Sequence, residues 1–170
     1  MTTPVSSRRV VRLDLGADSS RVWVEEEGRS NELVLPIGTS DVSALFLRDP
    51  PRETELEAAI DVVEEAVMPL AKLIPPQAIL VAGNASARQL VGLSTGTSKS
   101  RAAALDAIEA QFELLALAAR RGAWTGENHP APALSAGLLI LREFMHHIGF
   151  DRIELDGSTE VGRSTFGQGF

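Results

Sequence analysis

The stretch "VVRLDLGADSSRVWVEEEG" at residues 10–28 decides the fold prediction. Over 10–14, valine and leucine alternate with charged side chains, which is the period of a strand with one buried face. A turn of glycine, aspartate and serine follows at 15–20, and the alternation then resumes as a second strand. The stretch "NELVLPIG" at 31–38 predicts a third strand, which its proline and glycine end. The opening part of the chain therefore predicts an antiparallel meander.

After this meander, helical and strand patterns alternate along the chain. Prolines and a glutamate-rich first turn predict a helix over 49–73. The short apolar run at 77–83 predicts a central strand that is buried on both faces. This order indicates an α/β fold, a mixed sheet of about five strands flanked by helices. The other elements that we expect are helices at 39–49, 84–93, 98–122 and 133–150, a loop at 122–132 and a strand at 151–157.

The composition argues against several classes of protein. The 170 residues contain no cysteine, which excludes disulfides and thiolate metal sites. The net charge of −7 argues against a nucleic-acid binder, because such proteins neutralise phosphates with many cations. The longest apolar run, at 131–141, is too short to span a bilayer, which takes about 20 residues. We therefore expect a cytoplasmic protein that binds neither nucleic acid nor a membrane.

A chain of this length and composition favours one domain with a substantial core. We predict a flexible tail at 1–9, a single domain at 10–157 and a tail rich in glycine and serine at 158–170. No apolar segment follows Met1, so no signal peptide is expected.

Four stretches of the sequence together resemble a known family. They are "LDLGADSSRV" at 13–22, the segment 35–67 that begins "LPIG", "LVAGNASARQL" at 80–90, and the segment 132–155 that begins "PALSAG". In this order and at similar spacing, they resemble the Ppx/GppA family of exopolyphosphatases and guanosine pentaphosphate phosphatases. The resemblance implies a ribonuclease H-like fold of the actin-like ATPase superfamily. It covers the family's second actin-like subdomain only, and the first subdomain, which would precede residue 10, is expected to be absent.

The resemblance also implies a phosphate site assisted by Mg²⁺. Asp14 matches a metal-site aspartate of the family, although a strand-end carboxylate in solvent explains it equally well. Asn84 is explained by a helix N-cap, and the serines by ordinary turn formation. The phosphate-binding residues implied by the resemblance are Gly16, Ser19, Ser20, Gly83, Asn84 and Ser86.

The sequence departs from the family where catalysis would need it most. Ala17 and Asp18 replace two glycines of the first phosphate turn, and each loss removes freedom of the backbone near a phosphate. Arg21 stands where the family has a glutamate, which reverses the charge. The family's catalytic glutamate belongs to the missing subdomain, so no catalytic residue is assigned here.

Three other features have ordinary structural explanations. His146 and His147 are adjacent, so on a helix they point about 100° apart, and we interpret them as helix C-terminal cations rather than metal ligands. The segment "GLSTGTSKS" at 92–100 lacks the Gly-Lys-Ser/Thr ending of a nucleotide-binding P-loop. The acidic run "VEEEG" at 24–28 is typical of a solvated sheet edge.

We predict a half-length Ppx/GppA-like protein that is catalytically impaired alone. It would bind a phosphorylated ligand, such as polyphosphate or a phosphorylated nucleotide, or a protein. Half of a two-subdomain cleft leaves one face exposed, so we expect a homodimer or a complex with a separate chain. The alternative is a Mg²⁺-dependent exopolyphosphatase-type hydrolase that is completed by a partner chain or a second protomer. A purely structural module without a ligand is a third interpretation.

Overall fold

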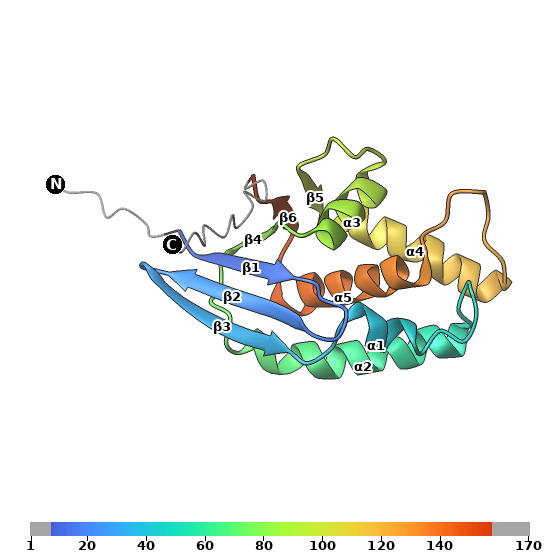
Figure 1. The fold of residues 1–170 in the computed structure, drawn as a ribbon, viewed down its shortest axis with the longest axis horizontal. Coiled ribbons are helices and arrows are strands. Elements are labelled where there is room, and N and C mark those ends of the chain that lie inside the picture. Colours follow the sequence, from blue (N-terminus) through green and yellow to red (C-terminus); the bar gives the residue numbers. More distant parts are fainter. Residues whose placement is uncertain (1–7, 158–170) are drawn as a thin grey trace, which may run out of the picture.

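A computed structural model describes residues 8–157 of the chain (Figure 1). The predicted tail at 158–170 and residues 1–7 of the predicted N-terminal tail lie outside the described residues. The elements are β1 (Val10–Asp14), β2 (Ser20–Glu26), β3 (Arg29–Leu35), α1 (Thr39–Ser43), α2 (Glu53–Ala71), β4 (Ile79–Ala82), α3 (Ala85–Thr95), β5 (Ala102–Ala104), α4 (Leu105–Arg121), α5 (Pro132–Ile148) and β6 (Arg152–Leu155).

The strands form one mixed sheet in the order β3-β2-β1-β4-β6-β5. The strands β1, β2 and β3 are an antiparallel meander, as the opening sequence predicts. The strand β4 lies parallel to both β1 and β6, and β5 pairs antiparallel with β6 at the far edge. The predicted α/β fold with a mixed sheet is confirmed, with six strands in place of about five.

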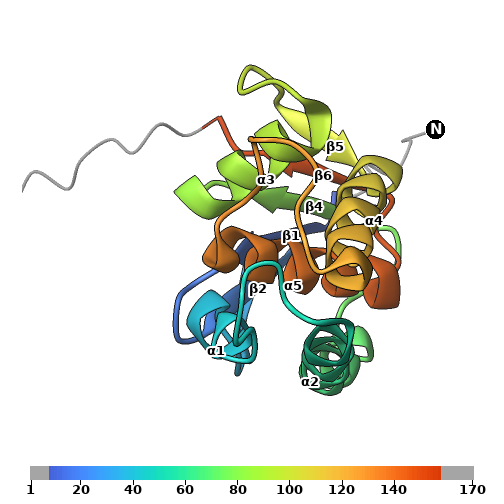
Figure 2. The same ribbon diagram turned by 90° about the vertical axis from the view of Figure 1, so that its right-hand side faces the viewer.

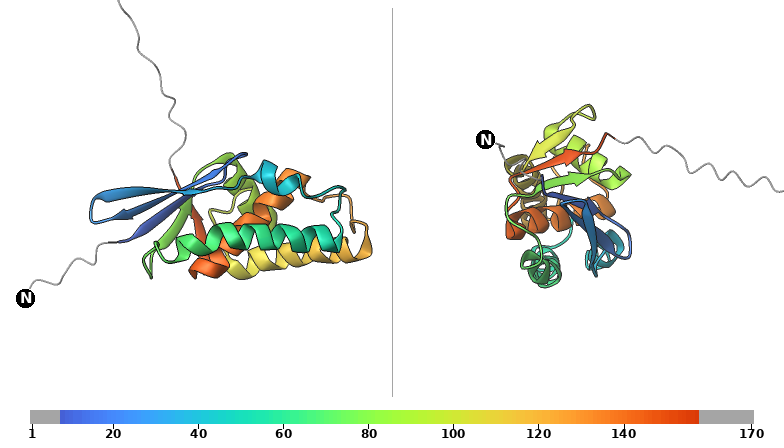
Figure 3. Two further views of the ribbon diagram at one scale, coloured as in Figure 1. Left: turned by 90° about the horizontal axis from the view of Figure 1, so that it is seen from below. Right: turned by 90° about the vertical axis from the view of Figure 1, so that its left-hand side faces the viewer.

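One face of the sheet carries the core. Leu13 pairs with Val22 on one side and with Ala82 on the other, and all three side chains are buried. Intervening residues such as Arg12 and Trp23 point to the opposite face and are only half-buried. The long helices α2, α4 and α5 lie side by side and contact one another (Figures 2 and 3). Their buried side chains join those of the sheet in one hydrophobic core.

The shorter helices α1 and α3 lie beyond the carboxyl ends of β1 and β4 (Figure 1). Both helices contact α5, which passes along the buried side of the sheet. Gly137 of α5 is the point of close approach, because a Cβ atom there would lie 3.4 Å from Leu90 of α3 and 3.5 Å from Thr39 of α1. Both short helices are therefore packed closely against α5.

Two sequence predictions about these elements are wrong. Residues 102–104 form the strand β5 rather than part of the predicted helix at 98–122, because their alanines pair with β6 and close the sheet. The strand β4 is central, as predicted, but it is fully buried on one face only: Leu80 and Ala82 are buried, whereas Ile79 and Val81 are half-buried. Within the described part of the chain, no helix covers that second face.

The amino-terminal arginines that the sequence assigns to a tail contact the sheet. The amide of Ile79 donates to the carbonyl of Arg9 at 2.9 Å, and the Arg9 side chain pairs with Glu26. Arg8 lies 4.0 Å from Glu154. Among residues 8–157, no helix is long and apolar enough to cross a membrane.

Candidate functional site

Two turns meet at the carboxyl edge of the parallel strands. The first turn follows Asp14 at the end of β1, and the second begins at Gly83 after β4. Because β1 and β4 are parallel neighbours, their carboxyl ends lie together at the same edge. The side-chain amide of Asn84 joins the turns, since it donates to the Asp14 carboxylate and, at 2.9 Å, to the carbonyl of Leu15. The residues predicted for a metal and for phosphate are therefore brought together here.

The first turn is closed by its own backbone and by α1. A Cβ atom on Gly16 would lie 2.1 Å from the carbonyl oxygen of Ser19, so this turn admits only glycine. The amides of Thr39 and Ser40 donate to the carbonyls of Gly16 and Ala17, both at 2.9 Å. The N-terminal amides of α1 are thus used within the protein, and Gly16 serves the turn itself.

The two serines of the first turn have different positions. Ser19 is exposed, whereas Ser20 is fully buried. The Ser20 hydroxyl donates to the carbonyl of Ile37 at 3.0 Å and so ties the start of β2 to the end of β3. A ligand at the surface of this edge would reach Ser19 but would not reach Ser20.

The second turn is open. Asn84 caps α3, as the sequence predicts, because its side-chain oxygen accepts a hydrogen bond from the amide of Ala87 at 3.1 Å. Within the described residues, the amides of Ala85 and Ser86 have no acceptor, as expected for the first turn of a helix. A Cβ atom on Gly83 would meet only Asp156, at an ordinary 3.6 Å. Free amides at a helix N-terminus favour an anion.

Arg21 of β2 lies directly opposite Asp14 of the neighbouring strand β1. The two residues are Cα partners between β1 and β2, so their side chains share the face that no described helix covers. The guanidinium is 60% exposed and lies 3.4 Å from Glu32 of β3. Arg21 is therefore a solvated cation near the edge, paired with a neighbouring strand.

A further carboxylate, Asp156, lies at the same edge and was not singled out from the sequence. It follows β6, and its amide donates to the carbonyl of Ala82 at 2.8 Å. Its side chain binds Arg12 of β1. The sequence signal for Asp156 is its position: it follows the strand β6, which runs parallel to β1, just as Asp14 lies at the end of β1.

The residues at this edge fit Mg²⁺ in a limited way. Mg²⁺ in phosphate sites is held by one or two carboxylates, several waters and the phosphates of the ligand. Asp14 offers one carboxylate, of which one oxygen already accepts the bond from Asn84. Asp156 is engaged by Arg12. A magnesium ion here would depend on Asp14, on waters and on the ligand.

Comparisons with known proteins bear on the fold. No family model and no curated protein matches this sequence. Solved structures, however, are similar, among them the following three. The Ppx/GppA enzyme of Aquifex aeolicus matches with a TM-score of 0.69 at 18% identity, over 88% of this chain and 53% of that one. An exopolyphosphatase-like protein matches with a TM-score of 0.70 at 14% identity, over 91% and 57% of the two chains. An exopolyphosphatase from Cytophaga hutchinsonii matches with a TM-score of 0.66 at 15% identity, over 91% and 55%.

At such low identity these matches define the fold alone. The chain spans slightly more than half the length of each of the three structures. The structural neighbours of this chain are therefore Ppx/GppA proteins, and its described part has the fold of about half of one of them.

Proposed function

We propose that the carboxyl edge of β1 and β4 binds a phosphorylated ligand. The observation that carries the proposal is the pair of free amides of Ala85 and Ser86, held beside Asp14 by the side chain of Asn84. Phosphate oxygens accept hydrogen bonds from such amides and are favoured by the positive end of the helix dipole. Ser19 and Ser86 add hydroxyl donors at accessible positions.

The ligand of the proposal carries a chain of phosphates, as polyphosphate and phosphorylated nucleotides do. Two of the three similar structures are named for exopolyphosphatase, which supports this class of ligand. A chain of phosphates would reach from the amides of α3 to Asp14, where Mg²⁺ and its waters would balance the negative charge. We leave Ser20 outside the binding set because it is fully buried.

The proposal describes binding rather than independent catalysis. In-line attack on a phosphoanhydride needs a side chain that places the attacking water, such as a carboxylate or an amide, besides the group that holds the metal. At this edge Asp156 is paired with Arg12, and Arg21 brings a positive charge to the face next to Asp14. A second copy or a separate chain would complete the half cleft, because the chain spans about half of its structural neighbours.

The role of the backbone amides as phosphate donors is tested by removing the amide hydrogen of Ala85 without changing the charge of its side chain. Ala85 is the first residue of α3, where proline is tolerated, and Asn84 before it has the extended backbone that proline requires (φ −77°, ψ 167°). We expect Ala85→Pro to fold normally and to weaken polyphosphate binding several-fold, measured by isothermal titration calorimetry with Mg²⁺ present.

The matched control is Glu53→Pro at the first residue of α2, after Arg52 in the same extended conformation. This variant also removes an amide at a helix start, but that helix is α2, which contributes no residue to the proposed phosphate site. It should therefore bind polyphosphate at least as tightly as the parent protein. Unchanged affinity in Ala85→Pro, or an equal loss in both variants, would contradict the proposal.

The alternative function, hydrolysis completed by a partner or a second protomer, rests on the second oxygen of Asp14, which accepts no hydrogen bond from residues 8–157. It is tested by measuring phosphate release from polyphosphate or guanosine pentaphosphate with Mg²⁺. Release that is abolished in Asp14→Ala supports the hydrolase, whereas release that survives this change contradicts it. Thermal stabilisation by polyphosphate without release supports binding alone, and the absence of both effects supports a purely structural module.

A further inference from the structure

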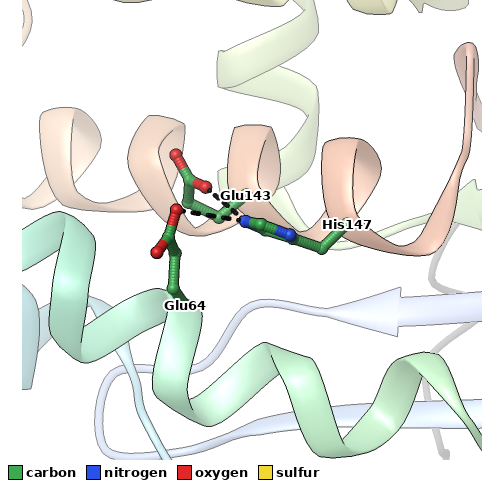
Figure 4. A group of neighbouring side chains, drawn as sticks. All are labelled: Glu64, Glu143 and His147. Carbon is green, nitrogen blue, oxygen red and sulfur yellow. Dashed lines mark hydrogen bonds and ion pairs between the residues drawn. The ribbon is translucent and has the colours of Figure 1, made fainter.

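A second cluster of metal-ligating side chains lies between α2 and α5, apart from the carboxyl edge of the sheet. Glu64 of α2 faces Glu143 and His147 of α5, and the three ligand atoms lie within 4.8 Å of one another (Figure 4). Glu143 and His147 are one helical turn apart, so they share a face of α5. This spacing is a common way for one helix to supply two ligands to a metal.

The contacts within the cluster converge on one nitrogen atom. His147 Nε2 lies 3.2 Å from Glu64 Oε1 and 3.1 Å from Glu143 Oε2. A ring nitrogen carries at most one hydrogen, so it donates fully to only one of the two carboxylates. Around a tetrahedral Zn²⁺, with bonds of about 2.0–2.2 Å, neighbouring ligand atoms stand roughly 3.3–3.6 Å apart. The two separations from His147 Nε2 are close to that spacing, and all three ligand atoms lie within 4.8 Å of one another.

The surroundings of the cluster suit a divalent ion. Glu143 is buried, with 1% of its side chain exposed, and its other oxygen is bound by Arg142. Such a hydrogen bond orients a ligating carboxylate from behind. Glu64 and His147 are 42% and 22% exposed, which leaves a path for an ion and for a water as fourth ligand. The neighbouring Glu109 of α4 is engaged by Arg142 and by His146.

We propose that Glu64, Glu143 and His147 form a zinc site, with water as the fourth ligand. The imidazole and the two carboxylates are ligands that Zn²⁺ accepts, and the charge of the ion balances the two glutamates. The site links α2 to α5 and is separate from the phosphate edge. The adjacent histidines His146 and His147 did not indicate this zinc site, because one of its ligands, Glu64, belongs to another helix, α2.

The test uses the full, untagged 170-residue chain, stripped with EDTA and titrated with Zn²⁺ at pH 7.5 by calorimetry. We expect one Zn²⁺ to bind per chain. Glu64→Gln and His147→Gln each keep a polar side chain but remove a good ligand, and we expect each to weaken binding by at least about tenfold, the scale on which even outer-shell partners act. These two residues are partly exposed, so circular dichroism should show the parent fold.

Matched controls lie next to each ligand. His146→Gln removes the adjacent imidazole, and Glu65→Gln removes an exposed glutamate beside Glu64, so both should bind Zn²⁺ as the parent does. Asp14→Asn should also retain binding, which separates this site from the phosphate edge. Absence of stoichiometric binding by the parent, persistence of binding in His147→Gln, or an equal loss in the control variants would overturn the proposal and leave a hydrogen-bonded cluster only.

Discussion

The two turns at the carboxyl edge look alike in sequence and differ in structure. Each follows a strand and contains a glycine, with a serine within three residues of that glycine. The first turn is closed, because Gly16 fits against its own backbone and α1 binds its carbonyls. The second is open, because Gly83 has room for a side chain and α3 offers free amides beyond it. Glycine in the first turn is needed for the fold, whereas the second turn retains the donors that a ligand would use.

The largest effect is expected from Gly16→Ala in the closed turn. The new Cβ would stand 2.1 Å from the carbonyl oxygen of Ser19, so the backbone of the turn must shift and its contact with α1 is lost. We expect a loss of about 3 kcal/mol in the free energy of unfolding, at the high end of overpacking. Urea denaturation measures it, and a change below about 1 kcal/mol would show that the turn is not closed in solution.

The next effect is expected from Asn84→Ala, which breaks the connection between the turns. The change removes the cap of α3 and the bonds to Asp14 and Leu15. We expect a loss of about 2 kcal/mol in the free energy of unfolding, since a cap alone contributes roughly 1 kcal/mol. Polyphosphate binding should weaken as well. Asn84→Asp serves as the control, because it keeps the cap but brings a second carboxylate against Asp14.

A smaller effect is expected from Ser20→Ala in the closed turn. The buried carbonyl of Ile37 loses its donor, which costs about 1–2 kcal/mol in the free energy of unfolding. The affinity for polyphosphate of the folded protein should not change, because Ser20 is buried. The neighbouring Ser19 is exposed, so Ser19→Ala should leave the free energy of unfolding within about 0.5 kcal/mol of that of the parent. A large loss of affinity in Ser20→Ala would mean that the closed turn opens to ligands.

The smallest effect on stability is expected from Gly83→Ala in the open turn. The added methyl group meets only the Cβ of Asp156, at 3.6 Å, and Gly83 does not lie in the left-handed region. Replacing glycine at such a position restricts the unfolded chain, so we expect a change within about 1 kcal/mol, in the direction of greater stability. Thermal unfolding of Gly83→Ala and Gly16→Ala under the same conditions measures the difference between their effects on stability. Equal destabilisation by the two substitutions would remove the difference between the turns.

The sequence carried enough information for most of the fold. Alternation over 10–14 and 20–25 marked the meander, because each strand has one buried face. Prolines before α2 and the capping asparagine of α3 marked helix starts that the structure confirms. The strand β5 was missed because three alanines have no period, and only pairing with β6 holds them extended.

The site was less predictable, because its contacts join residues far apart in the chain. The family resemblance implied Asp14 and Asn84 as site residues, but it did not predict the hydrogen bond between them. The use of the α1 amides by the first turn has no sequence signal at all. Two helices and two strands separate Glu64 from His147 in the sequence, so their proximity depends on the packing of α2 against α5.

The pair of hydrogen bonds from α1 to the first turn also has a consequence for motion. A helix as short as α1 is not stable in isolation, because the conformational entropy lost in forming the first turn exceeds the free energy gained from its hydrogen bond. Its persistence depends on its packing against α5 and on the carbonyls that Gly16 and Ala17 present to Thr39 and Ser40. Turn and helix should therefore open as one cooperative unit, so that in a hydrogen-exchange experiment the amides of Thr39 and Ser40 become labelled together rather than fray independently.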